Sequence, residues 1–130
     1  MDYGFSDSEL LVSTADGLHF TLKRAFTYRR KDGELITVPL ETTSDGASTP
    51  RFLWRVFPPF GKYWKGAFLH DYLYRDSKRP KEFCDETFLE AMEFLNVEDV
   101  EAHTMYEGVH LLGWHSFQED REEQNKEAKL

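Results

Sequence analysis

The sequence predicts an α+β domain in which an N-terminal three-stranded antiparallel meander is followed by three to four helices. Two observations support this fold class. Short apolar runs separated by Asp-Gly pairs fill the chain up to Leu40, and after Pro50 the apolar residues recur at helical spacing. A small sheet with helices against one side would bury both patterns.

Three strands are expected before Leu40. Asp-Gly pairs lie between them and suit tight hairpin turns, because glycine accepts the positive φ that such turns demand. The expected strands are Leu10 to Val12, Leu18 to Tyr28 and Leu35 to Pro39, with turns at Asp16-Gly17 and Asp32-Gly33.

The helical part should hold a short piece near 50–56 and helices over about 63–75, 80–95 and 97–114. Pro80 suits a helix start and Asn96 a helix end. The tail from Gln118 to Leu130 is mostly charged and polar, so we expect a frayed helix end or disorder there. One globular domain should therefore span residues 1–117.

Composition narrows the function classes. The chain has 130 residues, 40% of them hydrophobic, and a formal charge of -8, which disfavours nucleic acid as a partner because phosphate binding needs clustered Lys and Arg. Cys84 is the single cysteine, so no intramolecular disulfide can form, and no apolar run is long enough for a transmembrane helix. The N-terminus lacks the features of a secretory signal peptide. We expect a reducing cytoplasm or the inside of a particle.

Four residues of the helix near 63–75 share one face. Ala67, His70, Asp71 and Tyr74 occupy positions i, i+3, i+4 and i+7, so a histidine and an aspartate lie together with a phenol one turn further on. A lone histidine on an apolar helix face is more often a core residue than a functional one. The neighbouring acids are what make a reactive site worth considering.

Asp85 lies on the apolar stripe of the next helix, in the series Asp85, Phe88, Leu89 and Met92. A buried carboxylate is costly unless a donor faces it. The short connection makes the two helices antiparallel neighbours, so Asp85 can reach a ring nitrogen of His70. Such a contact would fix the tautomer and leave the other nitrogen to act as a general base.

The segment Ser44-Asp45-Gly46-Ala47-Ser48-Thr49-Pro50 could supply oxygen ligands upstream of this helix. Calcium prefers carboxylate and carbonyl oxygens, and Gly46 would let the backbone approach an ion. Asp45, Gly46 and Asp71 are therefore candidate calcium ligands, in a site that would polarise an ester while His70 activates water. A loop followed by a helix capped by Ser48 is the simpler alternative.

Two other chemistries carry less weight. Zinc could be held by His70, Asp71 and one of His103, His110 or His115, but these lack a His-Glu-x-x-His type of spacing. Cys84 adjoins Asp85 and lies away from a helix start, which disfavours a reactive thiolate.

These motifs resemble a phage-associated family known as domain of unknown function 1353. The similarity runs from Val38 to about Gly113 and is carried by Val38-Pro39, the 44–50 segment, Leu69-His70-Asp71-Tyr72-Leu73-Tyr74, Asp85 with Phe88, Ala91-Met92 and Met105-Tyr106. The resemblance implies a phage or prophage protein, located in the host cytoplasm or in the phage particle. It implies no activity.

The same residues resemble the prokaryotic and fungal secreted phospholipases A2, which have an Asp-Gly-Cys-Ser calcium loop and a Cys-x-x-His-Asp-x-x-Tyr helix. That resemblance implies Asp45 and Asp71 as calcium ligands with the backbone of Gly46, and His70 as the base. Asp85 would orient the base, and Tyr74 matches the tyrosine of the motif. Phospholipid or another ester would be the substrate.

This chain departs from those enzymes at the two cysteines that join their loop to their helix. Ala47 and Ala67 stand at the matching positions, so both halves of one disulfide are missing together. A reducing compartment would produce that change. The segment between the motifs is also longer here, and the similarity covers barely a third of the chain.

The longer segment, residues 51–65, has four basic residues, no acid and many aromatics. It resembles an interfacial patch that meets lipid headgroups, or else a protein interface or core. The candidate interface residues are Trp54, Phe57, Phe60, Tyr63 and Trp64. The rival to an enzyme is accordingly a phage accessory or virion protein that uses this scaffold to bind another phage protein.

Overall fold

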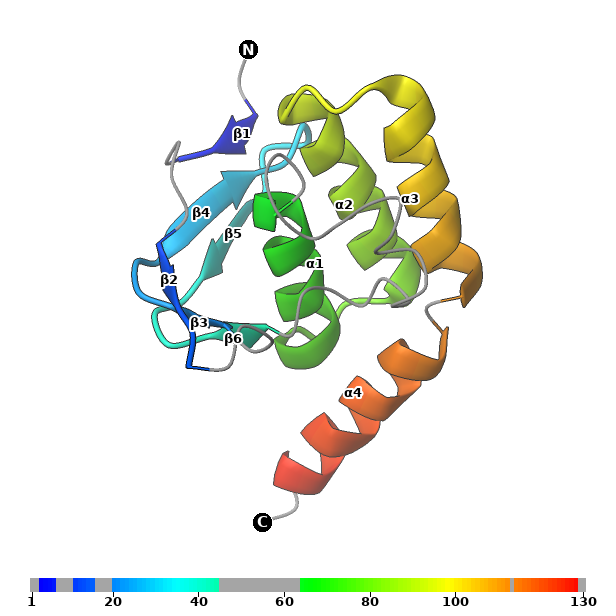
Figure 1. The fold of residues 1–130 in the computed structure, drawn as a ribbon. Helices are drawn as coiled ribbons and strands as arrows, with labels where there is room; N and C mark the ends of the chain where they lie inside the picture. Colours follow the sequence, from blue (N-terminus) through cyan, green and yellow to red (C-terminus); the bar gives the residue numbers. More distant parts are fainter. Residues whose placement is uncertain (1–2, 7–10, 16–19, 45–63, 113, 129–130) are drawn as a thin grey trace.

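The computed structural model describes residues 3–6, 11–15, 20–44, 64–112 and 114–128. Six strands precede four helices in this part of the chain (Figure 1). The strands are β1 (Gly4–Phe5), β2 (Val12–Ser13), β3 (Phe20–Leu22), β4 (Phe26–Arg29), β5 (Leu35–Val38) and β6 (Thr43–Ser44). The helices are α1 (Trp64–Asp76), α2 (Lys81–Phe94), α3 (Asp99–Leu112) and α4 (Trp114–Ala128).

The strands form two small antiparallel sheets, with the orders β1-β4-β5 and β2-β3-β6. The expected α+β class is confirmed. The three-stranded sheet is not a meander of consecutive strands, however, because β1 pairs with β4 and fills the place expected for the segment around Val12.

The long strand expected from Leu18 to Tyr28 is replaced by β3 and β4, which belong to different sheets. Arg24 explains the break. In one continuous strand it would share a face with Leu22 and Phe26, which are both buried. A bend at 23–25 leaves Arg24 exposed and keeps its two apolar neighbours inside.

The β4–β5 hairpin forms where Asp32-Gly33 predicted it. Gly33 has a φ of 92°, which side-chain-bearing residues rarely adopt, and its N–H donates to the carbonyl oxygen of Arg30 at 2.9 Å. The backbone N–H of Glu34 donates to Oδ1 of Asp32 at 2.9 Å. The Asp16-Gly17 turn lies outside the described residues.

The first three helices are arranged in layers. α1 and α2 lie side by side over the strands, and α3 packs on the side of α2 that is away from them (Figure 1). α2 ends as Asn96 predicted: this residue has a φ of 62°, its N–H bonds to Glu93, and the N–H of Val97 reaches back to Met92. The sharp end lets α3 return along α2.

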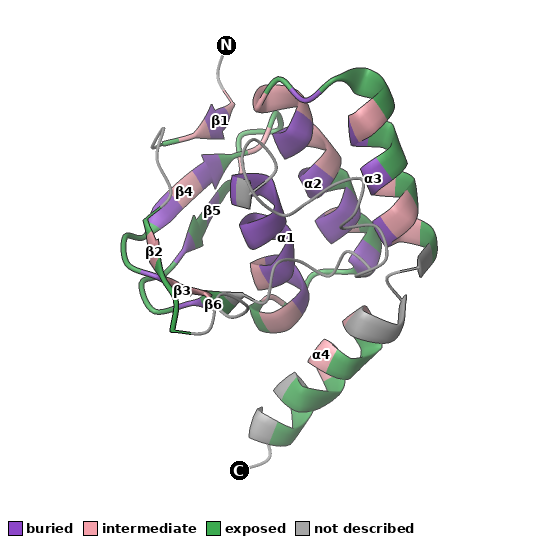
Figure 2. Cartoon of the chain, in the orientation of Figure 1, coloured by how far each residue is buried: buried purple, intermediate pink, exposed green. Residues whose placement is uncertain are grey.

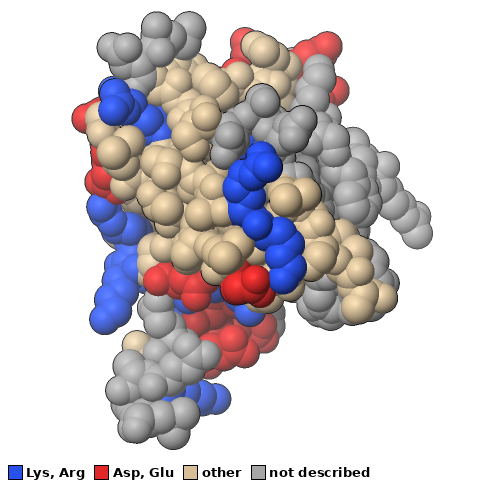
Figure 3. Space-filling view, turned by 90° about the vertical axis from the view of Figure 1, so that its left-hand side faces the viewer, with Lys and Arg blue, Asp and Glu red and all other residues tan. Residues whose placement is uncertain are grey.

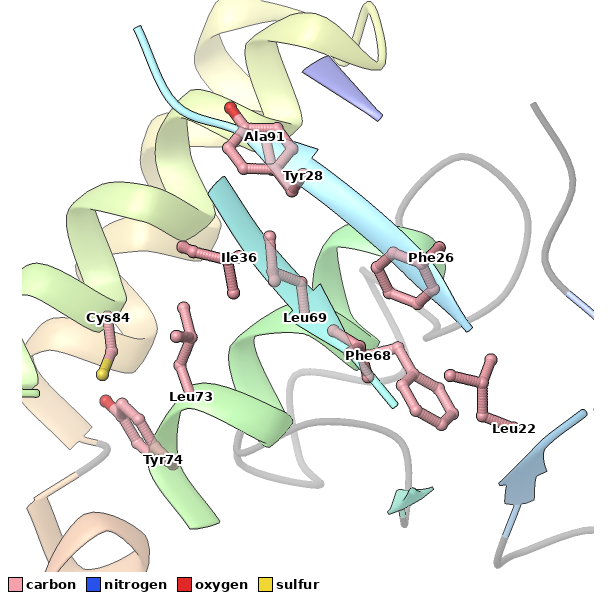
Figure 4. Packing of buried hydrophobic residues seen from close by; sticks show 11 residues of the cluster. Leu22, Phe26, Tyr28, Ile36, Phe68, Leu69, Leu73, Tyr74, Cys84 and Ala91 are labelled. Atoms are coloured by element: carbon pink, nitrogen blue, oxygen red, sulfur yellow. The ribbon is translucent and has the colours of Figure 1, made fainter. Parts of the chain in front are cut away.

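Buried residues follow these layers (Figure 2). Side chains from β4, β5, α1 and α2 converge in one apolar cluster (Figure 4). A second cluster lies between α2 and α3 and contains Phe88, Met92, Ala102, Met105 and Val109. The face of α1 that meets α2 lies between the two clusters, and it carries the buried polar side chains of His70 and Asp71.

The charged C-terminal stretch is helical as far as Ala128, whereas the sequence suggested fraying or disorder. Arg121 ties α4 to the end of α1, since its guanidinium donates to the carbonyl oxygens of Tyr74 and Leu73 at 3.2 and 3.3 Å. It also donates to the carbonyl oxygen of Arg79. These contacts are made by a cation, so a search for an apolar stripe could not find them.

No helix in the described part of the chain is both long and apolar enough to cross a bilayer. The short helical piece expected near 50–56 lies outside the described residues.

Candidate functional site

The predicted face of α1 is buried. Ala67, His70, Asp71 and Tyr74 each retain 2% or less of their accessible surface. α2 runs beside this face, and Asp85 of α2 is likewise completely buried. The apolar stripes of the two helices therefore bring one imidazole, two carboxylates and one phenol into the interior.

Asp85 and His70 meet as the sequence suggested. Nε2 of His70 lies 2.7 Å from Oδ1 of Asp85. The hydroxyl of Tyr74 donates to the same oxygen at 2.6 Å. All three candidate catalytic residues are thus joined in one hydrogen-bonded network, with Asp85 at its centre.

Lys81 completes this network, and the sequence analysis missed it. Its ammonium donates to Oδ2 of Asp85 at 2.7 Å and to the carbonyl oxygens of Val109 and His110 at 2.9 and 2.8 Å. A signal was present, because Lys81 precedes Asp85 by four residues and so shares its helix face.

The network keeps Asp85 ionised. Burial by itself would raise the pKa of this carboxyl group, but the hydrogen bonds from His70, Lys81 and Tyr74 outweigh burial and lower the pKa to about 2. For His70 burial is the largest influence, and it lowers the pKa of the imidazole despite the opposing effect of Asp85. The resting pair is therefore a carboxylate and a neutral imidazole.

These protonation states fix the tautomer of His70. An ionised carboxylate can only accept, so Nε2 carries the proton and donates it to Asp85, and Nδ1 is left as an acceptor. Nδ1 is buried and has no hydrogen-bond partner among the described residues. Leaving a buried acceptor unsatisfied costs about 1–3 kcal/mol, and such atoms call for an explanation.

Aromatic rings enclose the imidazole. The ring centroid of His70 lies 4.2 Å from that of Tyr74 and 4.8 Å from that of Phe88. The hydroxyl of Tyr74 is held by Asp85, and burial together with that hydrogen bond raises the pKa of the phenol. Tyr74 is therefore a neutral donor that supports Asp85.

The candidate metal ligands are described only in part. Asp71 is buried, with Oδ2 3.7 Å from the guanidinium of Arg75. Arg75 also donates to the carbonyl oxygen of Thr43 in β6 at 3.3 Å. β6 ends at Ser44, so the chain leaves β6 beside the helix that holds Asp71. Asp45 and Gly46 lie outside the described residues.

The described residues contain no group of three or more His, Cys, Asp or Glu that could hold a metal ion. His103 is exposed and contacts the carbonyl oxygen of Asp99, while His110 stacks on Tyr106. The side chain of His115 is not among those described. Cys84 is buried, which raises the pKa of its thiol to about 12 and disfavours the thiolate.

The candidate interface falls almost wholly outside the described residues. Trp54, Phe57, Phe60 and Tyr63 are not described, and Trp64 is described only as the first residue of α1. On the face seen in Figure 3, the described Lys and Arg side chains are interspersed with Asp and Glu.

Comparison with known protein families assigns the chain to one of them. The model for the family described as "Protein of unknown function (DUF1353)" matches residues 20–109. The chain belongs to this family. The matched segment of this DUF1353 protein begins at β3 and includes α1, α2 and all four residues of the Asp85 network. No curated protein and no solved structure matches the chain.

Proposed function

We propose that this DUF1353 protein is a calcium-dependent ester hydrolase of the phospholipase A2-like type, encoded by a phage or prophage. The observation that carries the proposal is the state of His70. Its Nε2 is fixed by Asp85 at 2.7 Å, while Nδ1 is an unprotonated acceptor with no hydrogen-bond partner in the described part of the chain. A fixed tautomer with one acceptor nitrogen lets an imidazole act as a general base when a water molecule reaches that nitrogen.

In the proposed reaction Nδ1 of His70 takes a proton from a water molecule as the water oxygen forms a bond to the ester carbonyl carbon. The imidazole becomes a cation, which the Asp85 carboxylate stabilises through Nε2. When the acyl carbon–oxygen bond breaks, the imidazolium returns the proton to the departing alkoxide. Tyr74 holds Asp85 in place through its hydroxyl throughout.

Calcium is part of the proposal because the chemistry of the donor set fits it. Asp71 supplies a hard carboxylate oxygen beside His70, in a buried position where a negative charge favours a cation nearby. Asp45 and the backbone at Gly46 would supply further oxygens. When bound, the ion would polarise the ester carbonyl.

The calcium arm can be tested without knowing the substrate. Isothermal titration calorimetry should give saturable binding of one Ca²⁺ to the wild type and a loss of that binding in Asp71→Asn. Asp76→Asn is the matched control, since Asp76 is an exposed aspartate of the same helix. Absence of binding to the wild type at millimolar calcium would reject the calcium-dependent mechanism.

The hydrolytic arm needs a substrate screen of phospholipid vesicles and soluble esters with calcium present. Activity should be lost in His70→Gln and retained in His103→Gln, because His103 is exposed and lies outside the network. Vesicles and soluble esters together distinguish a lipase from an esterase. Equal rates for His70→Gln and the wild type would remove His70 from the reaction.

A second candidate is a non-enzymatic phage accessory or virion protein that binds another phage protein, in the host cytoplasm or in the particle. Complete burial of His70 beneath Phe88 and Tyr74 favours it, since a histidine that only packs in the core would be buried in the same way. Mass spectrometry of purified phage particles would test it. Equal incorporation of the wild type and His70→Gln, with no hydrolysis by either, would favour this candidate.

A further inference from the structure

Lys81 contacts three oxygen atoms, one in its own helix α2 and two in α3. Its ammonium lies 2.7 Å from Oδ2 of Asp85, 2.9 Å from the carbonyl oxygen of Val109 and 2.8 Å from that of His110. An ammonium carries three protons, so these contacts use all of them. The side chain is only 3% exposed, and its charge is matched inside the protein by one carboxylate and two carbonyl dipoles.

The position of Lys81 is unfavourable for α2 taken alone. It is the first residue of that helix, where the helix dipole disfavours a cation. It is favourable for α3, because Val109 and His110 belong to the last turn, whose carbonyls lack partners within the helix. The lysine thus links the end of α3 to Asp85 at some cost to the start of α2.

Asp85 is consequently held from both sides. Oδ1 accepts from His70 and Tyr74 of α1, and Oδ2 accepts from Lys81 of α2. Nδ1 of His110 lies 3.5 Å from Oδ2, so α3 contributes a fourth neighbour. The negative charge of Asp85 already has a cation, and the imidazole of His70 need not supply one.

We propose that Lys81 is a positioning residue: it fixes the Asp85 carboxylate so that Oδ1 faces His70 and Tyr74. Its catalytic consequence rests on the proposed hydrolase, whereas its effect on the His70 tautomer does not. Without Lys81 the Asp85 carboxylate would keep hydrogen-bond donors on Oδ1 only. The carboxylate could then rotate toward His110, or it could take up part of the proton that Nε2 of His70 carries.

The test compares Lys81→Met, which removes the charge at similar length, with Lys81→Arg, which keeps the charge. Lys78→Met is the control, because Lys78 is exposed in the α1–α2 connection. Imidazole ¹⁵N chemical shifts at one fixed pH report which nitrogen of His70 is protonated. The wild type and Lys78→Met should show the proton of His70 on Nε2 alone. In Lys81→Met the shifts should indicate a mixture of protonation states. Lys81→Arg should restore the Nε2-protonated form in part. Unchanged shifts in Lys81→Met would overturn the proposal.

Kinetics adds a second measurement if an ester substrate is found. Lys81→Met should lower kcat by about 10- to 100-fold, by analogy with residues that orient the ligands of metal sites, with little change in KM. Loss of kcat with a matching rise in KM would instead indicate a general structural defect. If the wild type hydrolyses nothing, the hydrolase proposal fails while the imidazole shifts still decide the role of Lys81.

A wild-type measurement covers the case in which Lys81→Met does not fold. A buried ammonium with three acceptors should be protected from solvent exchange, so its ¹H–¹⁵N signal should be visible, with contacts to Val109. Lys81→Arg identifies the signal by its disappearance. A rapidly exchanging Lys81 ammonium would overturn the proposal.

Discussion

Helix α1 borders two buried regions that are built in opposite ways. On the strand side Phe68, Leu69 and Leu73 pack into an apolar cluster with β4 and β5 (Figure 4). On the α2 side His70 and Tyr74 surround the carboxylate of Asp85, and Lys81 closes the network. One helix therefore contributes to an ordinary core and to a buried charge network.

The two regions should contribute differently to stability. Apolar burial stabilises the folded state by about 25 cal/mol per Å² of surface removed from water. A buried ion pair often gives no net stability compared with well-packed apolar residues of similar size, because both charges must leave water. The strand side should therefore contribute more net stability than the charge network on the α2 side.

The largest effect that would sharpen this comparison is expected from Asp85→Asn. It removes the counter-charge of the buried Lys81 ammonium, so we expect a loss of about 3–5 kcal/mol in the free energy of unfolding. Urea unfolding followed by circular dichroism would measure it.

The double variant Asp85→Leu with Lys81→Met is the matched comparison. Removing both charges should recover most of the stability lost in Asp85→Asn, because no unpaired ion remains. A loss below about 1 kcal/mol in Asp85→Asn would contradict the view that the network is a tightly coupled buried unit.

The next effect concerns the strand side. Leu22→Ala should cost about 3 kcal/mol, within the usual range for a leucine removed from a core, because Leu22 is fully buried in the strand-side cluster. Leu11→Ala serves as control, since Leu11 is about half exposed. The ¹⁵N shifts of His70 should not change in Leu22→Ala, and a change would show that the two regions are not separable.

The helix pair and the contact between Asp85 and His70 could be predicted from the sequence, for an identifiable reason. His70 and Tyr74 are four residues apart in α1, Asp71 and Tyr74 are three apart, and Asp85 leads a series with Phe88 and Leu89 in α2, so the period of the helix fixes their faces. A carboxylate on an apolar stripe then requires a donor, and the antiparallel pair offers His70. Local rules were enough here.

The same rules could not give the contacts of Lys81 with α3 or the broken strand, because both depend on distant parts of the chain. Lys81 is satisfied by carbonyl oxygens at the end of α3, which no spacing within α2 reveals. β3 and β4 are separate strands because each pairs with different partners. β3 lies between β2 and β6, and β4 lies between β1 and β5, so each strand has one partner that precedes it in the sequence and one that follows it. Short strands of two residues also carry little pattern of their own.

Acid should weaken the network side by about 2 kcal/mol. The pKa of Asp85 is lowered from its ordinary 3.8 to about 2, so its stabilising effect is present above pH 3.8 and is lost as the pH falls toward 2. The lowered pKa of His70 reduces stability at a higher pH. Below the ordinary histidine pKa of 6.5 the unfolded chain takes up a proton at His70, whereas the folded chain does not. Stability should therefore begin to fall below pH 6.5 and fall again below pH 3.8.

Urea midpoints measured from pH 8 to pH 3 would record both losses. His70→Gln should remove the decline that starts near pH 6.5 and leave the decline below pH 3.8 in place. A wild-type midpoint that stays constant from pH 7 to pH 4.5 would contradict a buried neutral histidine.

The smallest effect, about 1 kcal/mol, is expected from Arg121→Ala in α4. Arg121 donates to the carbonyl oxygens of Leu73 and Tyr74, and Phe117 packs its ring edge-on to Tyr74 at 5.1 Å. Lys126→Ala, an exposed change in the same helix, should have no effect on urea unfolding.

α4 lies beyond the family-matched segment that ends at residue 109, yet it contacts the tyrosine of the network. A shift of the Tyr74 ring signals in Arg121→Ala would therefore show that α4 supports the Asp85 side, whereas a loss of stability with those signals unchanged would assign α4 to the fold alone.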